Sequence, residues 1–220
     1  MFCEVIMRKF FNEIRQPVTI SITKKILYSV LIFAVGIALG IVSKILDETA
    51  SNSLPYVLQM LDLRNFFSRM GVWLFSGICI AMYSKSFKRA ALNSFLFFVG
   101  MVSSYYAYTI MIVGFYPKSY MMIWFAMTVV SPFLGAICWY AKGTHIISIC
   151  ISAIIFMVMT RQAFNFGFWY LDISYFLELL LWGATIFVLY EKSKQILTVL
   201  SIGIILFFIT SQLHLLGGML

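Results

Sequence analysis

The chain has 220 residues, of which 62% are hydrophobic, 18% aromatic and only 11% charged, and its formal net charge is +8 at pH 7. A soluble domain carries roughly 25% charged residues, so this composition cannot cover a water-exposed surface and excludes a soluble globule. Disordered, collagen-like and disulfide-dense chains are excluded too, because they are polar, glycine-periodic or rich in cysteine. With a mean hydropathy of +0.97, the chain is expected to be an all-α integral membrane protein.

An amphipathic cytoplasmic leader is the first predicted element, within residues 1–25. On a helical wheel one half is apolar and the other polar, and Pro17 ends the pattern. Such a helix could lie in the headgroup plane or dock on a partner subunit. The first apolar run starts near Ile26, after a basic segment and without a small-residue cleavage site, so it is interpreted as a retained span and not as a signal peptide. The apolar half of the wheel holds Phe2, Ile6, Met7, Phe10, Phe11 and Ile14.

A single transmembrane helical domain is expected over residues 26–220. A bilayer core needs about 20 helical residues, and seven apolar runs qualify, although six spans remain possible. The runs are continuously apolar, which favours helices over an alternating β-barrel. The second and fifth runs reach the length of a span only if an arginine near one end is included. The sixth run is slightly short and contains Glu178. The seven predicted spans are 26–46, 65–84, 90–115, 119–141, 145–163, 173–190 and 196–216.

The distribution of Lys and Arg predicts the orientation, because cytoplasmic loops carry the excess of positive charge. With the N-terminus inside, eleven Lys and Arg fall on inside segments and five at outside ends. The first outside loop is also acidic. Seven spans then place the C-terminus outside, and the predicted address is a bacterial plasma membrane.

The first span carries small residues on one face, among them Gly36 and Gly40. A G-x-x-x-G pair lets another helix approach closely. The pair is interpreted either as packing within the chain or as a docking face for a partner subunit.

The third span is the most polar one. Asn93, Ser104 and Tyr108 fall on one helical stripe, and their polar groups need partners inside a bilayer. We therefore expect this stripe to face the bundle, with Phe95, Phe98 and Val102 more exposed to lipid. The stripe either makes hydrogen bonds between helices or lines a ligand site.

Three ionisable residues are predicted at one depth in the outer half: Arg69, Arg161 and Glu178. A carboxylate facing lipid is costly, so Glu178 is expected to face protein or water with one of the two arginines as its nearest cation. The aromatic loop 164–170 between spans is interpreted as an interface anchor or as a lid. Pro132 is expected to kink the fourth span and free a carbonyl, for packing or for a binding site.

Catalytic and metal chemistry find little support in the residues. His145 and His214 are predicted at opposite membrane faces, and the four cysteines have no C-x-x-C spacing. No nucleophile has a base at helical spacing, and no glycine-rich phosphate loop occurs. We predict no catalytic residues, no metal and no cofactor. Nucleic acid is not an expected partner, because the positive charges lie between apolar runs.

One part of the sequence, residues 36 to 143, resembles an uncharacterised family of multi-pass membrane proteins of Gram-positive bacteria. The resemblance implies a bacterial membrane address and no particular chemistry. A looser similarity is to the substrate-binding subunits of energy-coupling-factor transporters, which usually have six spans. The motifs that carry the first resemblance are GIVSKILD at 40–47, YSKSFKRAALN at 83–93, FFVGM at 97–101, Tyr105-Tyr106 and WYAKG at 139–143.

The predicted function is non-enzymatic binding or transport of a small molecule through a polar site in the outer half of the bundle. The alternative is a structural or regulatory subunit of a larger membrane complex, which would dock through the first helix and the leader. Besides the lipid bilayer, such a membrane subunit is the partner that the sequence suggests. The predicted ligand-binding residues are Asn93, Ser104, Tyr108, Glu178, Arg69 and Arg161.

Overall fold

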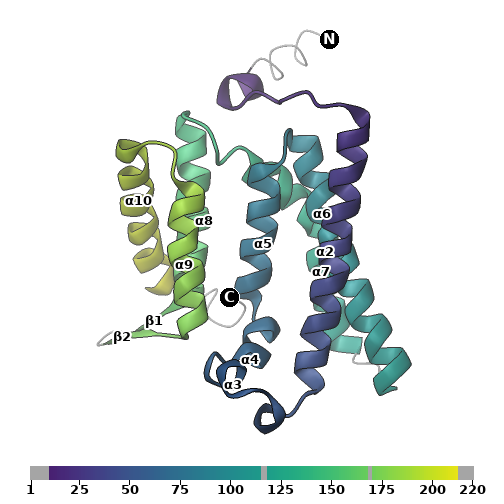
Figure 1. Cartoon of the computed structure of the whole chain (residues 1–220). Helices are drawn as coiled ribbons and strands as arrows, with labels where there is room; N and C mark the ends of the chain where they lie inside the picture. Colours follow the sequence, from purple (N-terminus) through teal and green to yellow (C-terminus); the bar gives the residue numbers. More distant parts are fainter. Residues whose placement is uncertain (1–9, 115–117, 168–169, 213–220) are drawn as a thin grey trace. The chain divides into compact units, whose positions relative to one another are not determined.

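The structure is a computed structural model that describes residues 10–114, 118–167 and 170–212 (Figure 1). Nearly all of its regular elements are helices, as the composition predicts, joined by one short β-hairpin. The elements are α2 (Ile22–Glu48), η1 (Ser51–Ser53), α3 (Tyr56–Met60), α4 (Leu63–Ser68), α5 (Met70–Tyr83), α6 (Phe87–Tyr108), η2 (Thr109–Val113), α7 (Lys118–Trp139), α8 (Ile146–Ala163), β1 (Phe164–Gly167), β2 (Tyr170–Ile173), α9 (Phe176–Leu189) and α10 (Ser193–Gln212).

Five helices of the described residues are long and apolar enough to cross a membrane: α2, α6 with η2, α7, α8 and α10. The predicted second and sixth spans form the helices α5 and α9, of 14 residues each. At 1.5 Å per residue such a helix is about 21 Å long, against a hydrocarbon core of about 30 Å. A multi-pass helical membrane protein is therefore supported, and the count of seven spans stays a prediction.

Reporter fusions test whether α5 and α9 cross. If both do, a fusion after Asn52 or Asn165 is external, and one after Ser86 or Lys192 is cytoplasmic, because each pair then lies on opposite sides of one helix. Alkaline phosphatase activity and green fluorescent protein fluorescence at the four positions are the measurements. The same side for Asn52 and Ser86 would remove α5 from the spans, and the same side for Asn165 and Lys192 would remove α9.

The described chain divides into two compact units. Unit 2 comprises residues 18–69 and 76–139, and unit 1 comprises residues 1–17, 70–75 and 140–220. Helix α5 contributes its first six residues to unit 1 and the others to unit 2. The single domain predicted for residues 26–220 stays a prediction.

Unit 2 is built on the close packing of α2 against α6 (Figure 1). A methyl group added at Gly36 would overlap the carbonyl oxygen of Phe97, and one at Gly40 would overlap that of Met101. From the other side, a methyl at Gly100 would lie 2.6 Å from the carbonyl oxygen of Phe33. The two backbones thus meet where neither helix carries a side chain. The predicted G-x-x-x-G face is occupied within this chain.

Helix α6 is buried on more than one side. The prediction that Phe95, Phe98 and Val102 are exposed to lipid is therefore wrong in part. Phe95 is 37% exposed, as expected, but Phe98 is 8% and Val102 only 2% exposed. The Phe98 ring lies against Gly77 of α5, while α7 packs on α6 at another face, where Gly135 meets Ser94. A single inward stripe assumes one neighbouring helix, whereas α6 has three.

Pro132 lies inside α7, where it removes the hydrogen bond that its own nitrogen would make to the carbonyl of residue 128. The Ser131 hydroxyl donates to that carbonyl oxygen at 2.8 Å. Because Thr128 and Ser131 are both buried, the freed acceptor is satisfied inside the helix. This arrangement favours the packing interpretation of Pro132 over a binding site.

Unit 1 is built around α8, on which α9 and α10 both pack (Figure 1). The Trp182 indole donates to the Thr160 hydroxyl at 3.0 Å, joining α9 to α8. At Gly203 of α10 an added methyl would lie 3.0 Å from the carbonyl oxygen of Ala153. Small residues and one hydrogen bond therefore set the helix contacts of this unit.

The expected aromatic loop between α8 and α9 contains a β-hairpin. Strands β1 and β2 pair antiparallel, with Phe164 opposite Ile173 and Gly167 opposite Tyr170. The Phe166 ring packs on Phe208 of α10, with ring centroids 5.0 Å apart. Residues 168 and 169 lie outside the described residues, so the choice between anchor and lid stays open.

The end of the leader contacts its own chain. Residues 10–14 are helical, Ile14 is 4% exposed, and the Phe11 ring lies 5.5 Å from that of Tyr140. Burial lowers the pKa of Arg15, and the nearby Glu191 carboxylate opposes this shift. The apolar positions Phe2, Ile6 and Met7 fall outside the described residues. Both predicted roles of the leader, in the headgroup plane or on a partner, stay predictions.

Candidate functional site

The turn 84–86, which joins α5 to α6, contributes two residues to the candidate site and is fixed by several hydrogen bonds. The Ser86 side chain caps α6 by accepting from the Arg89 backbone N–H at 3.3 Å. The Trp139 indole donates to the Ser84 carbonyl at 2.8 Å, and the Val18 backbone N–H donates to the Lys85 carbonyl at 2.8 Å. A cap and two long-range hydrogen bonds therefore fix the position of this short basic turn.

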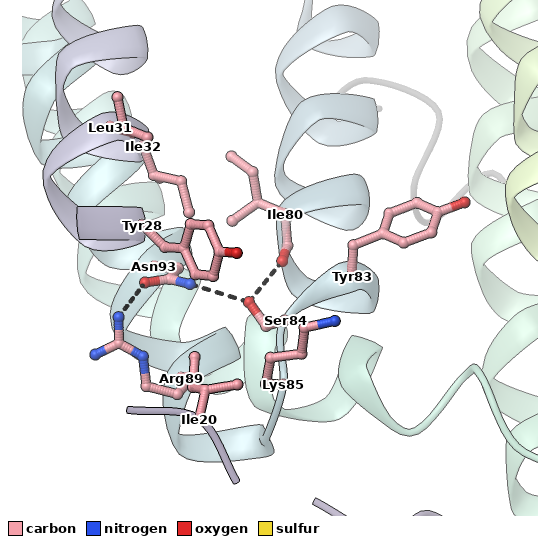
Figure 2. Close-up of a pocket in the computed structure, with 10 residues that line it drawn as sticks. All are labelled: Ile20, Tyr28, Leu31, Ile32, Ile80, Tyr83, Ser84, Lys85, Arg89 and Asn93. Carbon is pink, nitrogen blue, oxygen red and sulfur yellow. Dashed lines mark hydrogen bonds between the residues drawn. The ribbon is translucent and has the colours of Figure 1, made fainter. Parts of the chain in front are cut away.

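Asn93 is the centre of a buried polar network that joins α2, α6 and the turn (Figure 2). Its Oδ1 accepts from the Ser29 hydroxyl at 2.9 Å and from Arg89 Nη2 at 3.3 Å. Its Nδ2 donates to Ser84 Oγ at 3.1 Å, and Ser84 Oγ donates to the Ile80 carbonyl at 2.8 Å. Because Asn93, Ser29 and Ser84 are all buried, the network satisfies polar groups that would otherwise be costly in a bilayer.

The Arg89 side chain keeps part of its hydrogen-bonding capacity free. Its Nη2 donates to the Lys25 carbonyl and the Ser29 hydroxyl as well as to Asn93. In the described residues Nη1 and Nε make no hydrogen bond, and the Lys85 ammonium has no polar partner. A guanidinium has five donors in a fixed fork, so Arg89 is held in place through one nitrogen while the others are available to a ligand.

A pocket of about 350 Å³ lies beside this network (Figure 2). Its polar part is formed by the turn and α6, and its apolar part by α2 and the last turns of α5. Leu31 and Tyr28 line it and are also 51% and 43% exposed at the surface. The lining residues are Ile20, Tyr28, Leu31, Ile32, Ile80, Tyr83, Ser84, Lys85, Arg89 and Asn93.

Charge in unit 2 is separated along the helices. The pocket end carries five cations and no acid, and the acids of the unit all lie at the other end of α2 or beyond it. From Lys25 to Asp47 the rise along α2 is about 33 Å, several Debye lengths at physiological salt. The cations of the pocket end are Lys24, Lys25, Lys85, Lys88 and Arg89, and the acids are Asp47, Glu48 and Asp62.

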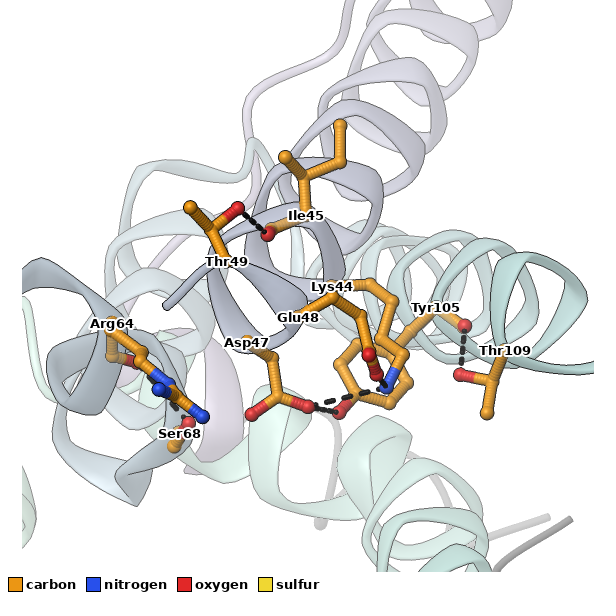
Figure 3. Close-up of polar contacts among 9 residues, drawn as sticks. All are labelled: Lys44, Ile45, Asp47, Glu48, Thr49, Arg64, Ser68, Tyr105 and Thr109. Carbon is orange, nitrogen blue, oxygen red and sulfur yellow. Dashed lines mark hydrogen bonds and ion pairs between the residues drawn. The ribbon is translucent and has the colours of Figure 1, made fainter. Parts of the chain in front are cut away.

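At the far end of α2 the acids are already paired (Figure 3). The Lys44 ammonium, buried at 5% exposure, contacts Asp47 at 3.2 Å and also Glu48. The Tyr105 hydroxyl of α6 donates to Asp47 at 3.0 Å, and Asp62 pairs with Arg69 at 3.1 Å. This cluster joins the C-terminal halves of α2 and α6. It leaves the cations of the pocket end without an acidic neighbour in the unit.

The three predicted ligand-binding residues of α6 do not lie together. Along α6, Ser104 lies about 16 Å from Asn93, and its hydroxyl donates to the Ile37 carbonyl at 3.0 Å. Tyr108 is half-buried and belongs to neither network, whereas its neighbour Tyr105 does. Asn93 alone of the stripe lines the pocket.

The residues predicted in the outer half fall in both units. Glu178 of α9 is 2% exposed and lies against Gly71 and Gln162 of unit 1, so it faces protein as expected. Arg161 Nε and Nη1 are buried and make no hydrogen bond within the described chain, and the place of Arg161 as the nearest cation of Glu178 stays a prediction. Arg69 belongs to unit 2, and its pairing with Glu178 stays a prediction.

Sequence reasoning missed Ser29, Ser84, Lys85 and Arg89 as site residues. A signal for two of them was present, because Lys85, Arg89 and Asn93 follow one another at steps of four, which places neighbours on one helical face. The basic residues were interpreted as orientation signals only. Their second role depends on α2 and α5, which no local pattern places beside α6.

The described residues hold no group of three or more His, Cys, Asp or Glu placed to bind a metal ion. Comparison of the chain with models of known families, with curated proteins and with solved structures finds no match. The resemblance noted from the sequence motifs therefore stays an expectation, and the function has to be argued from the pocket.

Proposed function

We propose that the chain is an integral protein of a bacterial plasma membrane that binds a small anionic molecule with an apolar body. Binding takes place in the pocket between α2, α5 and α6, and the protein catalyses no reaction on its ligand. The observation that carries the proposal is that two cations, Lys85 and Arg89, line a largely apolar cavity without an acidic neighbour in the unit.

Electrostatics favours an anionic ligand. Each unpaired cation at the edge of a low-dielectric region gains from a nearby negative charge, by about 4 kcal/mol for a pair 4 Å apart at an effective dielectric constant of 20. The Nη1 and Nε hydrogens of Arg89 remain available as charge-assisted donors to an oxygen of a carboxylate or phosphate. Asn93, Ser29 and the Lys25 carbonyl hold the guanidinium in place through Nη2, so little conformational entropy is lost when a ligand orders it.

The apolar wall favours a ligand that has a hydrocarbon or ring body. Ile20, Ile32 and Ile80 line the cavity together with Tyr28 and Leu31. Each buried methylene of a ligand contributes about 0.8 kcal/mol, so a short chain adds as much as the charge. A simple inorganic anion would leave this wall unused.

The proposed pocket lies at a different position from the site predicted from the sequence, but the proposed role, binding a small molecule, is the same. Sequence reasoning put the site in the outer half, whereas this pocket lies at the end that carries Lys85, Lys88 and Arg89. The positive-inside rule assigns that end to the cytoplasmic side. The alternative, a subunit docked through the first helix and the leader, relied partly on Gly36 and Gly40, a face that α6 already covers.

Thermal unfolding with matched probes tests the proposal. In a neutral maltoside detergent, decyl phosphate should raise the melting temperature of the purified protein more than decanol, which lacks the charge, or butyl phosphate, which lacks the chain. A probe at one hundred times its Kd stabilises by about 2.7 kcal/mol. Equal effects of decyl phosphate and decanol, or no effect of any probe, would count against the proposed function.

A further inference from the structure

We infer that the anion held by Lys85 and Arg89 is the phosphate of an anionic membrane phospholipid, whose acyl chains leave the pocket sideways past Leu31 and Tyr28. This inference rests on the proposed function and names its ligand class. It depends on the depth of the pocket, on its exposed apolar edge and on its lack of a carboxylate.

The depth of the pocket matches a lipid. Lys85 and Ile20 lie just outside the first residues of α6 and α2, at the level of a helix end. Tyr28 and Ile32 lie six and ten residues into α2, about 9 and 15 Å further along the axis. The cavity therefore reaches from the headgroup level into the hydrocarbon region of a bilayer whose core is about 30 Å thick.

The apolar edge of the pocket is open to the surface of the unit. Leu31 lines the cavity and is 51% exposed, and Tyr28 lines it and is 43% exposed. On a membrane-spanning helix, exposed apolar side chains face acyl chains. A lipid could therefore keep its chains in the bilayer while its phosphate reaches Arg89.

The headgroup chemistry follows from the charges. The free Nη1 of Arg89 can donate to a phosphate oxygen, and the Lys85 ammonium can approach another. A choline or ethanolamine group would bring a positive charge into a pocket whose lining has no carboxylate and already contains Lys85 and Arg89. This arrangement discriminates against zwitterionic lipids. Basic pockets between helices on the cytoplasmic side are typical sites for anionic headgroups.

Native mass spectrometry of the whole chain tests the inference. The protein is released from micelles that contain phosphatidylglycerol and phosphatidylcholine with identical acyl chains in equal amounts. We expect at least tenfold more bound phosphatidylglycerol. Lys85→Gln, which removes a charge without a polar partner among the described residues, should reduce this preference severalfold. Lys118→Gln is the matched control, because Lys118 lies at the other end of the unit, and it should leave the preference unchanged.

Other outcomes separate this inference from the proposed function. Equal retention of the two lipids would overturn the lipid assignment, and so would displacement of decyl phosphate by glycerol 3-phosphate at similar concentration, which would identify a soluble phosphate compound as the ligand. In both cases stabilisation by decyl phosphate would still support the proposed function. A preference unaffected by Lys85→Gln, or lost equally in Lys118→Gln, would overturn the placement of the lipid in this pocket.

Discussion

Gly36→Ala and Gly40→Ala are each expected to lower the free energy of unfolding by about 1–3 kcal/mol, the usual cost of overpacking a tight contact. The added methyl groups would overlap backbone oxygens of Phe97 and Met101. Backbone atoms cannot rotate away as a flexible side chain can. Helices α2 and α6 would have to separate, and Ser104 would lose its hydrogen bond to Ile37.

Gly183→Ala is the matched control for these variants. Gly183 also lies in an apolar helix, but an added methyl group there would meet nothing within 4 Å. Its melting temperature should be unchanged or slightly higher, because alanine favours the helix by up to about 1 kcal/mol over glycine. Intrinsic fluorescence during heating in a neutral detergent gives the comparison. Equal melting temperatures for Gly36→Ala and Gly183→Ala would contradict the close packing of α2 on α6.

Sequence patterns predicted the long helices better than the breaks and short strands between them. The runs that became α2, α6, α7, α8 and α10 are long and continuously apolar, which only a helix satisfies in lipid. The predicted second span started at residue 65, but Arg69 separates α4 from α5 there with an extended backbone. Apolar composition carries no information on such a break. The hairpin at 164–173 was missed because each strand has only four residues.

The candidate site shows where a single helical pattern stops being informative. Periodicity placed Asn93 on a buried face, and Asn93 is buried. The same stripe included Tyr108, which joins no network, and left out Tyr105, which bonds Asp47. Burial on α6 is decided by α2, α5 and α7 together, and their positions depend on long-range packing. Reasoning from one helix at a time therefore identified Asn93, at the centre of the pocket network, but not the residues that bond to it.

Asn93→Asp is expected to weaken anion binding at least tenfold while the protein stays folded. The new carboxylate keeps the acceptor that Ser29 and Arg89 use and brings a negative charge next to Arg89. Repulsion of a ligand anion 6–8 Å away amounts to about 2–3 kcal/mol at an effective dielectric constant of 20, part of which Arg89 screens. Only the hydrogen bond to Ser84 is lost, at a cost of about 1 kcal/mol.

Asn93→Leu separates this electrostatic effect from simple disruption of the network. Leucine removes both the acceptor and the donor, which leaves Ser29 and Ser84 without their partner and should cost about 1–3 kcal/mol per unsatisfied buried group. It adds no negative charge, so the Lys85 and Arg89 cations still attract an anion. We therefore expect Asn93→Leu to melt at a lower temperature than Asn93→Asp and yet to bind decyl phosphate more tightly. The reverse order of affinities would mean that the hydrogen-bonded geometry, and not the charge of the pocket, controls binding.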